Sequence, residues 1–124
     1  MEASRNYWIA SVSPGGRPHA APVWGLWHQD AFYFSTHPDS RKGHNIAAQP
    51  SVVIHLESGD EAVMIEGQAE PIEEATLLSE LDGEYFKKYA SHLDAGQTYR
   101  VTPEIGLAWA RDFTGTATRW EFAR

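Results

Sequence analysis

The residues best suited to chemistry lie in the stretch STHPDSRKGHN, residues 35–45. The hydroxyls of Ser35, Thr36 and Ser40 are followed directly by the cations Arg41 and Lys42. Hydroxyls, cations and the free N–H groups at the start of a helix are the groups that bind phosphate. Cations at a helix N-terminus interact unfavourably with the helix dipole, by roughly 0.3 kcal/mol, so an anionic partner would explain them. The spacing therefore predicts a phosphate site, and the alternative is a pair of merely solvated cations.

The overall charge of the chain makes this local concentration of cations unusual. The 124 residues include 17 acidic and 10 basic ones, for a formal net charge of −7. Affinity for nucleic acid rests largely on lysine and arginine, so no nucleic-acid partner is expected. Any anion must be held by a local site.

Metal and nucleophilic chemistry have little support in the sequence. No ligand spacing such as HExxH occurs, the chain has no cysteine, and no GxSxG nucleophile motif is present. Surface or hydrogen-bonded roles are expected for the histidines, no metal is predicted, and no catalytic residue is assigned. The histidines are His19, His28, His37, His44, His55 and His92.

The sequence pattern predicts short strands over most of the chain. Pro22 and Gly25 interrupt an apolar run, which predicts a bent strand of the kind that a ligand approaches closely. With few helices, this pattern predicts a mainly β fold, a six-stranded antiparallel barrel with small helices at its rim. The expected strands are residues 7–13, 19–27, 31–36, 51–58, 62–72, 97–112 and 116–122.

Two segments have helical signals. Residues 41–49 fit a short helix with Ser40 or Asp39 as N-cap and Pro50 after its end. Residues 73–90 carry large apolar residues at helical spacing, and Gly83 leaves open a division into two helices. We expect a single domain over residues 1–124. The chain shows no run of about 18 apolar residues and no signal peptide, so a cytoplasmic protein without a membrane partner is expected.

The quoted segments resemble one known family over nearly the whole chain, from YWIASVSPGGRPHAAPVWGLW through AFYFSTHPDSRKGHNIAAQPSVVIHLES and AVMIEGQAEPI to TRWEF. They are similar to the pyridoxamine 5′-phosphate oxidase-like, FMN-binding split-barrel proteins. The resemblance implies that Ser35, Arg41 and Lys42 hold the FMN phosphate, with Thr36 and Ser40 beside them. A tryptophan and an arginine ten residues apart reach the cofactor in the oxidases, and this chain matches both with Trp109 and Arg119.

As the resemblance implies, the protein is a flavin-dependent oxidoreductase that transfers hydride to or from a small organic substrate. The isoalloxazine ring is expected along the second strand, near Val23 and Trp24. Trp109 would cover one face of the ring, and Arg119 would donate to the ring edge or the ribityl chain. The active unit would be a homodimer with two cofactors at its interface.

The chain departs from the oxidases where they contact their substrate. Ala21 and the run WGLW, residues 24–27, replace an arginine and a lysine of the second strand. Gly115 and Ala117 replace the substrate-binding arginine and histidine. Pyridoxamine phosphate is therefore not the expected substrate.

Other cofactors remain open on the same fold. The deazaflavin F420 also offers a tricyclic ring and a phosphate, but its longer anionic tail needs more cations than this chain has, which favours FMN. A protein that binds flavin or haem without turnover is another alternative, with His19, His37 or His55 as the haem ligand. A domain with a vestigial site is the third.

Overall fold

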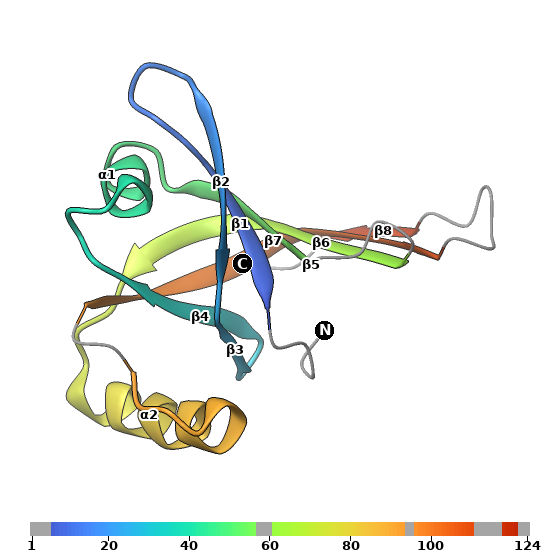
Figure 1. The fold of residues 1–124 in the computed structure, drawn as a ribbon. Coiled ribbons are helices and arrows are strands. Elements are labelled where there is room, and N and C mark those ends of the chain that lie inside the picture. Colours follow the sequence, from blue (N-terminus) through green and yellow to red (C-terminus); the bar gives the residue numbers. More distant parts are fainter. Residues whose placement is uncertain (1–5, 57–60, 94–95, 111–117, 122–124) are drawn as a thin grey trace.

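The computed structural model describes residues 6–56, 61–93, 96–110 and 118–121, and their side chains over 6–56, 64–93 and 96–106. It confirms a mainly β fold, although the antiparallel sheet has eight strands rather than the six expected (Figure 1). The strands are β1 (Tyr7–Val12), β2 (Pro18–Val23), β3 (Leu26–His28), β4 (Ala31–Thr36), β5 (Ser51–Leu56), β6 (Glu61–Pro71), β7 (Gln97–Ala110) and β8 (Thr118–Glu121). The helices are α1 (Arg41–Ala48) and α2 (Ala75–Tyr89).

Sheet topology explains why the barrel is split. The strand order is β2-β1-β5-β6-β7-β4-β3, with β8 added beside β7. The outermost strands of this path, β2 and β3, are consecutive in sequence and are joined only by Trp24 and Gly25. The sheet must therefore curl until its two ends meet, yet β2 and β3 do not pair. We call this unbonded boundary between β2 and the β3–β4 side the split, and Trp24 with Gly25 the bend.

The core fills the inside of the curl. Alternate residues of β1 point inward, so Tyr7, Ile9 and Ser11 are buried while their neighbours are half-buried. They pack with aromatic and aliphatic residues of the facing strands, including Phe32 and Phe34 of β4. A second apolar cluster lies between α2 and the outer side of β3 and β4. Each helix therefore rests on a different part of the sheet, α1 beside β1 and α2 below β3 (Figure 1).

Helix α1 forms where the sequence predicts it. Ser40 is the N-cap, because its Oγ accepts a hydrogen bond from the N–H of Gly43 at 3.1 Å. The last turn ends at Gln49, directly before Pro50. The buried side chain of Asn45 faces β1 and donates to Ser11 Oγ at 3.1 Å, so α1 is fixed against the ends of β1 and β2.

The suggested division of the second helix at Gly83 is wrong, because α2 runs without a break from Ala75 to Tyr89. A glycine inside a helix costs about 1 kcal/mol relative to alanine. Burial of Leu81 against β3 and β4 offsets that cost. Among the residues described, no helix is long and apolar enough to cross a bilayer.

Candidate functional site

The end of β4 and the start of α1 form a cluster of hydroxyl groups. Ser35 Oγ and Thr98 Oγ1 share a hydrogen bond of 2.7 Å, and Thr36 Oγ1 and Ser40 Oγ share one of 3.1 Å. Because successive residues of a strand point to opposite faces, Ser35 and Thr98 lie on the α2 side of the sheet with Tyr33, whereas Thr36 lies on the inner side with Phe34. The structure therefore joins Thr36 to Ser40 but not to Ser35, and it adds Thr98 as the partner of Ser35. Sequence reasoning missed Thr98 because it comes from β7, opposite Ser35 in the strand register. We call these four residues the hydroxyl cluster.

The two cations beside the hydroxyl cluster have no anionic partner among the residues that the structure describes. Arg41 is exposed and Lys42 is half-buried. Over the part of the chain that the structure describes, neither side chain takes part in a hydrogen bond or ion pair. The nearest acid in sequence, Asp39, instead lies 3.8 Å from His37 Nδ1 and 4.0 Å from His44 Nε2. Two uncompensated positive charges at a helix N-terminus are suited to bind an anion.

The free edge of β2 has an unusual set of backbone groups. At the turn between β1 and β2, the Ser13 N–H donates to the Arg17 carbonyl at 2.8 Å. Hydrogen-bonded and non-hydrogen-bonded pairs alternate along an antiparallel ladder, so every second residue of β2 from Arg17 onward bonds to β1. By this alternation the backbone groups of Pro18, Ala20 and Pro22 point away from β1. Because proline has no N–H, this edge presents three carbonyls and a single N–H, that of Ala20. Such an edge pairs poorly with another strand but can meet a ligand rim that mixes donors and acceptors.

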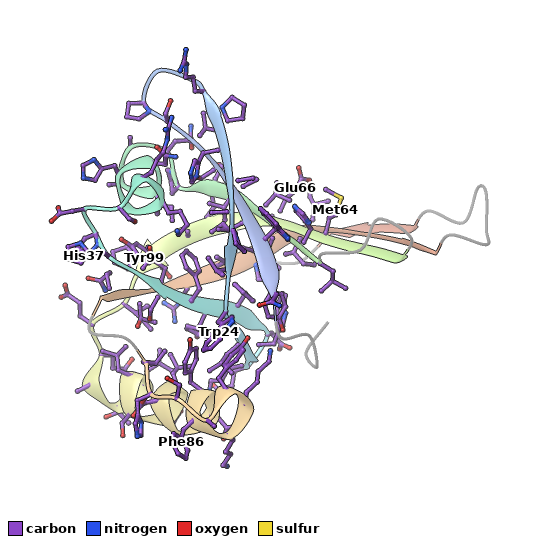
Figure 2. All side chains as sticks on the ribbon, in the orientation of Figure 1. Trp24, His37, Met64, Glu66, Phe86 and Tyr99 are labelled. Carbon is purple, nitrogen blue, oxygen red and sulfur yellow. The ribbon has the colours of Figure 1, made fainter. Side chains whose placement is uncertain are left out.

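The bend is held by α2, which the sequence did not link to the site. Tyr89 Oη accepts from the Gly25 N–H and donates to the Gly25 carbonyl, both at 2.9 Å. Lys88 Nζ donates to the same carbonyl at 3.0 Å and to Tyr7 Oη at 2.7 Å. Trp24 stacks on Tyr89, with ring centroids 4.6 Å apart and planes 3° from parallel. Trp24 therefore has a fixed position between the sheet and α2 (Figure 2).

The remaining predicted residues lie in different environments. Val23 is 9% exposed and its side chain belongs to the core, and by the same alternation its backbone groups point toward β1, so its contact with a cofactor stays a prediction. Trp109 and Arg119 lie on the neighbouring strands β7 and β8, opposite Ala62 and Leu107 respectively. Their side chains are outside the described residues, so their proposed contacts with a cofactor stay predictions.

Three buried polar atoms lack a hydrogen-bond partner among the described residues, and all three are on the strands that border the split. They are His19 Nδ1 on β2, and Trp27 Nε1 and His28 Nε2 on β3. His28 Nε2 lies 3.5 Å from Glu80 Oε2 of α2, an ion pair if the ring is protonated. The other two have no such neighbour. Because buried polar groups are nearly always satisfied, a bound molecule is one explanation for His19 and Trp27.

The ionisation of buried groups does not add an acid or base to this region. Burial raises the pKa of Tyr99, which stacks on Phe34 with centroids 5.4 Å apart. Its phenol therefore stays protonated and serves the core. Among the described residues, no group of three or more histidines and carboxylates is placed to hold a metal ion.

Two surface grooves have volumes of about 440 Å³ each. One is lined mainly by outward-facing residues of β1, β5, β6 and β7, including Ala10, Val53 and Glu66. The other lies between the start of α2 and the start of β7, and it includes Thr98 of the hydroxyl cluster. This second groove therefore lies on the α2 side of the sheet, next to the Ser35–Thr98 pair.

Comparison with known proteins decides the family. Residues 1–110 match the family model described as pyridoxamine 5′-phosphate oxidase. The chain belongs to the pyridoxamine 5′-phosphate oxidase-like family. Two curated proteins named pyridoxine/pyridoxamine 5′-phosphate oxidase are similar to this chain. The one from Bacteroides thetaiotaomicron is 32% identical and is matched over 90% of this chain and 53% of its own length. The one from Alcanivorax borkumensis is 34% identical, over 77% of this chain and 46% of its own length.

The chain therefore spans about half the length of the curated relatives it matches. Three solved structures under 25% identical to this chain show the fold alone. The conserved hypothetical protein Rv2991 from Mycobacterium tuberculosis has a TM-score of 0.76 at 23% identity, over 89% of this chain and 79% of that one. An F420 reductase has a TM-score of 0.69 at 19% identity, over 86% and 91%. The haem storage protein HutZ from Vibrio cholerae has a TM-score of 0.70 at 17% identity, over 81% and 82%.

Proposed function

We propose that this protein binds FMN along the split and acts as a flavin-dependent oxidoreductase on a small organic molecule. The observation that carries the proposal is the pair Arg41 and Lys42, which stand beside the hydroxyl cluster without an anion. A phosphate group would supply the missing negative charge and accept charge-assisted hydrogen bonds. Membership of the family supports a flavin as the molecule that bears this phosphate.

The residues of the split fit the rest of such a cofactor. The free edge of β2 can bond part of the pyrimidine rim of a flavin, because the Ala20 N–H can donate to a ring carbonyl and a β2 carbonyl can accept from the ring N–H. The unpartnered Nδ1 of His19 and Nε1 of Trp27 lie on the two strands that border the split. When bound, FMN would supply hydride transfer, and the protein would bind, orient and tune the ring.

Each predicted residue then has a separate task. Arg41 and Lys42 bind the phosphate together with the hydroxyls of Thr36 and Ser40, and Trp24 limits the position of the ring from the bend. Trp109 is assigned to one ring face and Arg119 to the ring edge or the ribityl chain. No side chain is assigned as a general acid, so the proton for a reduced substrate comes from solvent. The substrate is not pyridoxamine phosphate, because Ala21, Gly115 and Ala117 lack the required side chains.

We also propose that the protein is a homodimer, as in related split barrels. The outward faces of β1 and β5 carry Trp8, Ala10, Val12 and Val53, all half-buried. Neither helix in the described residues packs on this face. Light scattering on the purified protein tests this proposal, and a monomeric mass at micromolar concentration contradicts it.

Absorbance of the purified protein tests the cofactor. We expect a yellow protein whose flavin bands bleach with dithionite. A sharp Soret band would instead identify haem. A colourless protein that binds F420 tightly but not FMN would contradict the FMN assignment.

Replacement of both cations tests the site. Arg41→Ala with Lys42→Ala should weaken FMN binding by about 3 kcal/mol, roughly 100-fold, because two charge-assisted contacts are lost. A matched control is Lys87→Ala with Arg100→Ala, which changes the net charge equally on α2 and β7. Its residues form exposed ion pairs with Glu84 and Glu70. Equal affinities of both double variants in a titration would remove the phosphate role.

A further inference from the structure

His19 has an environment that the proposed contacts do not yet explain. It lies on β2 opposite Ser11 of β1, within the bonded set of residues whose side chains share the inner face. Its side chain is half-buried, and its Nδ1 is buried without a hydrogen-bond partner among the described residues. An imidazole nitrogen in such a place loses hydrogen bonds to water and gains none from the protein. The structure therefore leaves one polar atom of β2 unsatisfied.

The contacts around His19 connect it to the start of α1. Ser11, the neighbour of His19 across the ladder, accepts a hydrogen bond from Asn45 Nδ2 at 3.1 Å. Lys42 precedes Asn45 by three residues, so both lie on the same side of α1. Arg41 precedes Asn45 by four residues and lies on that side as well, with Lys42 half-buried and Arg41 exposed. His19 and Lys42 thus flank the Ser11–Asn45 contact from β2 and α1.

The same end of the barrel contains the hydroxyl cluster. β4 ends at Thr36, and α1 starts at Arg41 after the N-cap Ser40. β2 starts at Pro18 on the opposite side of the split. We call this end, formed by the start of β2, the end of β4 and the start of α1, the mouth of the split. Within the described part of the chain, it presents two cations without an anionic partner on one side and an imidazole nitrogen without a hydrogen-bond partner on the other.

We propose that His19 is a further phosphate-binding residue, whose Nδ1–H donates a hydrogen bond to a phosphate oxygen held by Arg41 and Lys42. One anion at the mouth satisfies the unpaired cations and the unpartnered nitrogen together. The assignment rests on the proposed function, because FMN supplies the phosphate. It also gives β2 a polar contact with the phosphate, which the methyl side chain of Ala21 cannot make.

The experiment compares FMN with riboflavin, which has the same ring and ribityl chain but no phosphate. Their affinities are measured by fluorescence titration of the apoprotein for the wild type, His19→Ala and His19→Gln. We expect His19→Ala to weaken FMN about tenfold, as for the loss of one hydrogen bond to a charged group, and to leave riboflavin unchanged. His19→Gln, which keeps an N–H donor, should recover part of the loss. His44→Ala is the control, since this exposed histidine of α1 has only Asp39 nearby, at 4.0 Å.

The outcomes separate the two proposals. A wild type that binds neither FMN nor riboflavin overturns the proposed function and this inference with it. If the wild type binds FMN more tightly than riboflavin and His19→Ala has the same preference, the inference about His19 is overturned and the proposed function is not. Equal losses for both ligands would assign His19 to general packing and overturn it as well. Should His19→Ala not fold, imidazole NMR of the wild type decides, because the Nδ1 resonance of His19 should shift with FMN and not with riboflavin.

Discussion

The two ends of the split differ in how completely their polar groups are paired. At the bend, the N–H and the carbonyl of Gly25 are both bonded to Tyr89, and Lys88 adds a second donor to the carbonyl. At the mouth, Arg41 and Lys42 have no ion-pair partner among the described residues, and His19 Nδ1 has no hydrogen bond there. Strand β2 contributes to both ends, so the difference lies in what each end contacts.

The difference indicates which end serves the fold and which serves a ligand. Paired, buried polar groups stabilise one conformation, and removal of a partner destabilises it. Unpaired cations contribute little to stability, and they are free to bind an anion. We therefore expect substitutions at the bend to lower stability and substitutions at the mouth to lower affinity.

The largest expected effect is that of Gly25→Ala. A Cβ at this position would lie 2.1 Å from Cζ of Phe32, whose ring is fully buried and contacts Tyr7. Such overpacking should destabilise the protein by about 3 kcal/mol, measured by urea unfolding. Gly83→Ala is the control, because nothing lies within 4 Å of its Cβ and alanine favours the helix. A stable Gly25→Ala variant would show that the bend tolerates movement.

A smaller effect is expected for Tyr89→Phe. The substitution keeps the stack with Trp24 but removes both hydrogen bonds to Gly25, which leaves a buried N–H unpaired. Stability should fall by about 2 kcal/mol, with FMN affinity nearly unchanged in the folded protein. The double variant of Arg41 and Lys42 should show the reverse, with lost affinity and an unchanged unfolding midpoint. Loss of affinity without loss of stability in Tyr89→Phe would break the contrast between the two ends.

The smallest effect concerns an exposed pair at the far end of α2. The Leu93 N–H, at 2.8 Å from Oδ1, and His92 lower the pKa of Asp82 from its ordinary value of 3.8. A lowered folded-state pKa stabilises the protein above the unfolded-state pKa, and this contribution is lost as the pH falls through the folded-state pKa. Thermal unfolding between pH 6 and pH 2 should therefore show a slightly steeper loss for the wild type than for Asp82→Asn. Identical profiles would show that this exposed contact adds nothing.

The parts predicted correctly depend on residues close in sequence. Ser40 caps α1 through the N–H of Gly43, three residues later in the sequence. The alternation of residues in β1 identifies the buried face of that strand. The division at Gly83 failed because burial of Leu81 decides the continuity of α2, and burial is a tertiary property. Thr98 and Tyr89 were missed because they reach Ser35 and Gly25 across 63 and 64 residues. For His19 the sequence predicted a surface or hydrogen-bonded role, with a haem ligand as the alternative, since nothing local shows that its Nδ1 is buried.

The sequence by itself determined the strand segments, the two helices, the N-cap of α1 and the concentration of hydroxyls and cations at residues 35–42, because each depends on neighbours within one or two turns. Only the tertiary structure decided what completes these features. It joined β2 to β3 across a two-residue bend, which splits the barrel. It also placed Tyr89 on Gly25, Thr98 on Ser35, and His19 opposite Ser11, the residue that contacts Asn45 of α1. Strand pairing over long sequence separations fixes these neighbours, and a pattern within one segment carries no information about its partner across the sheet.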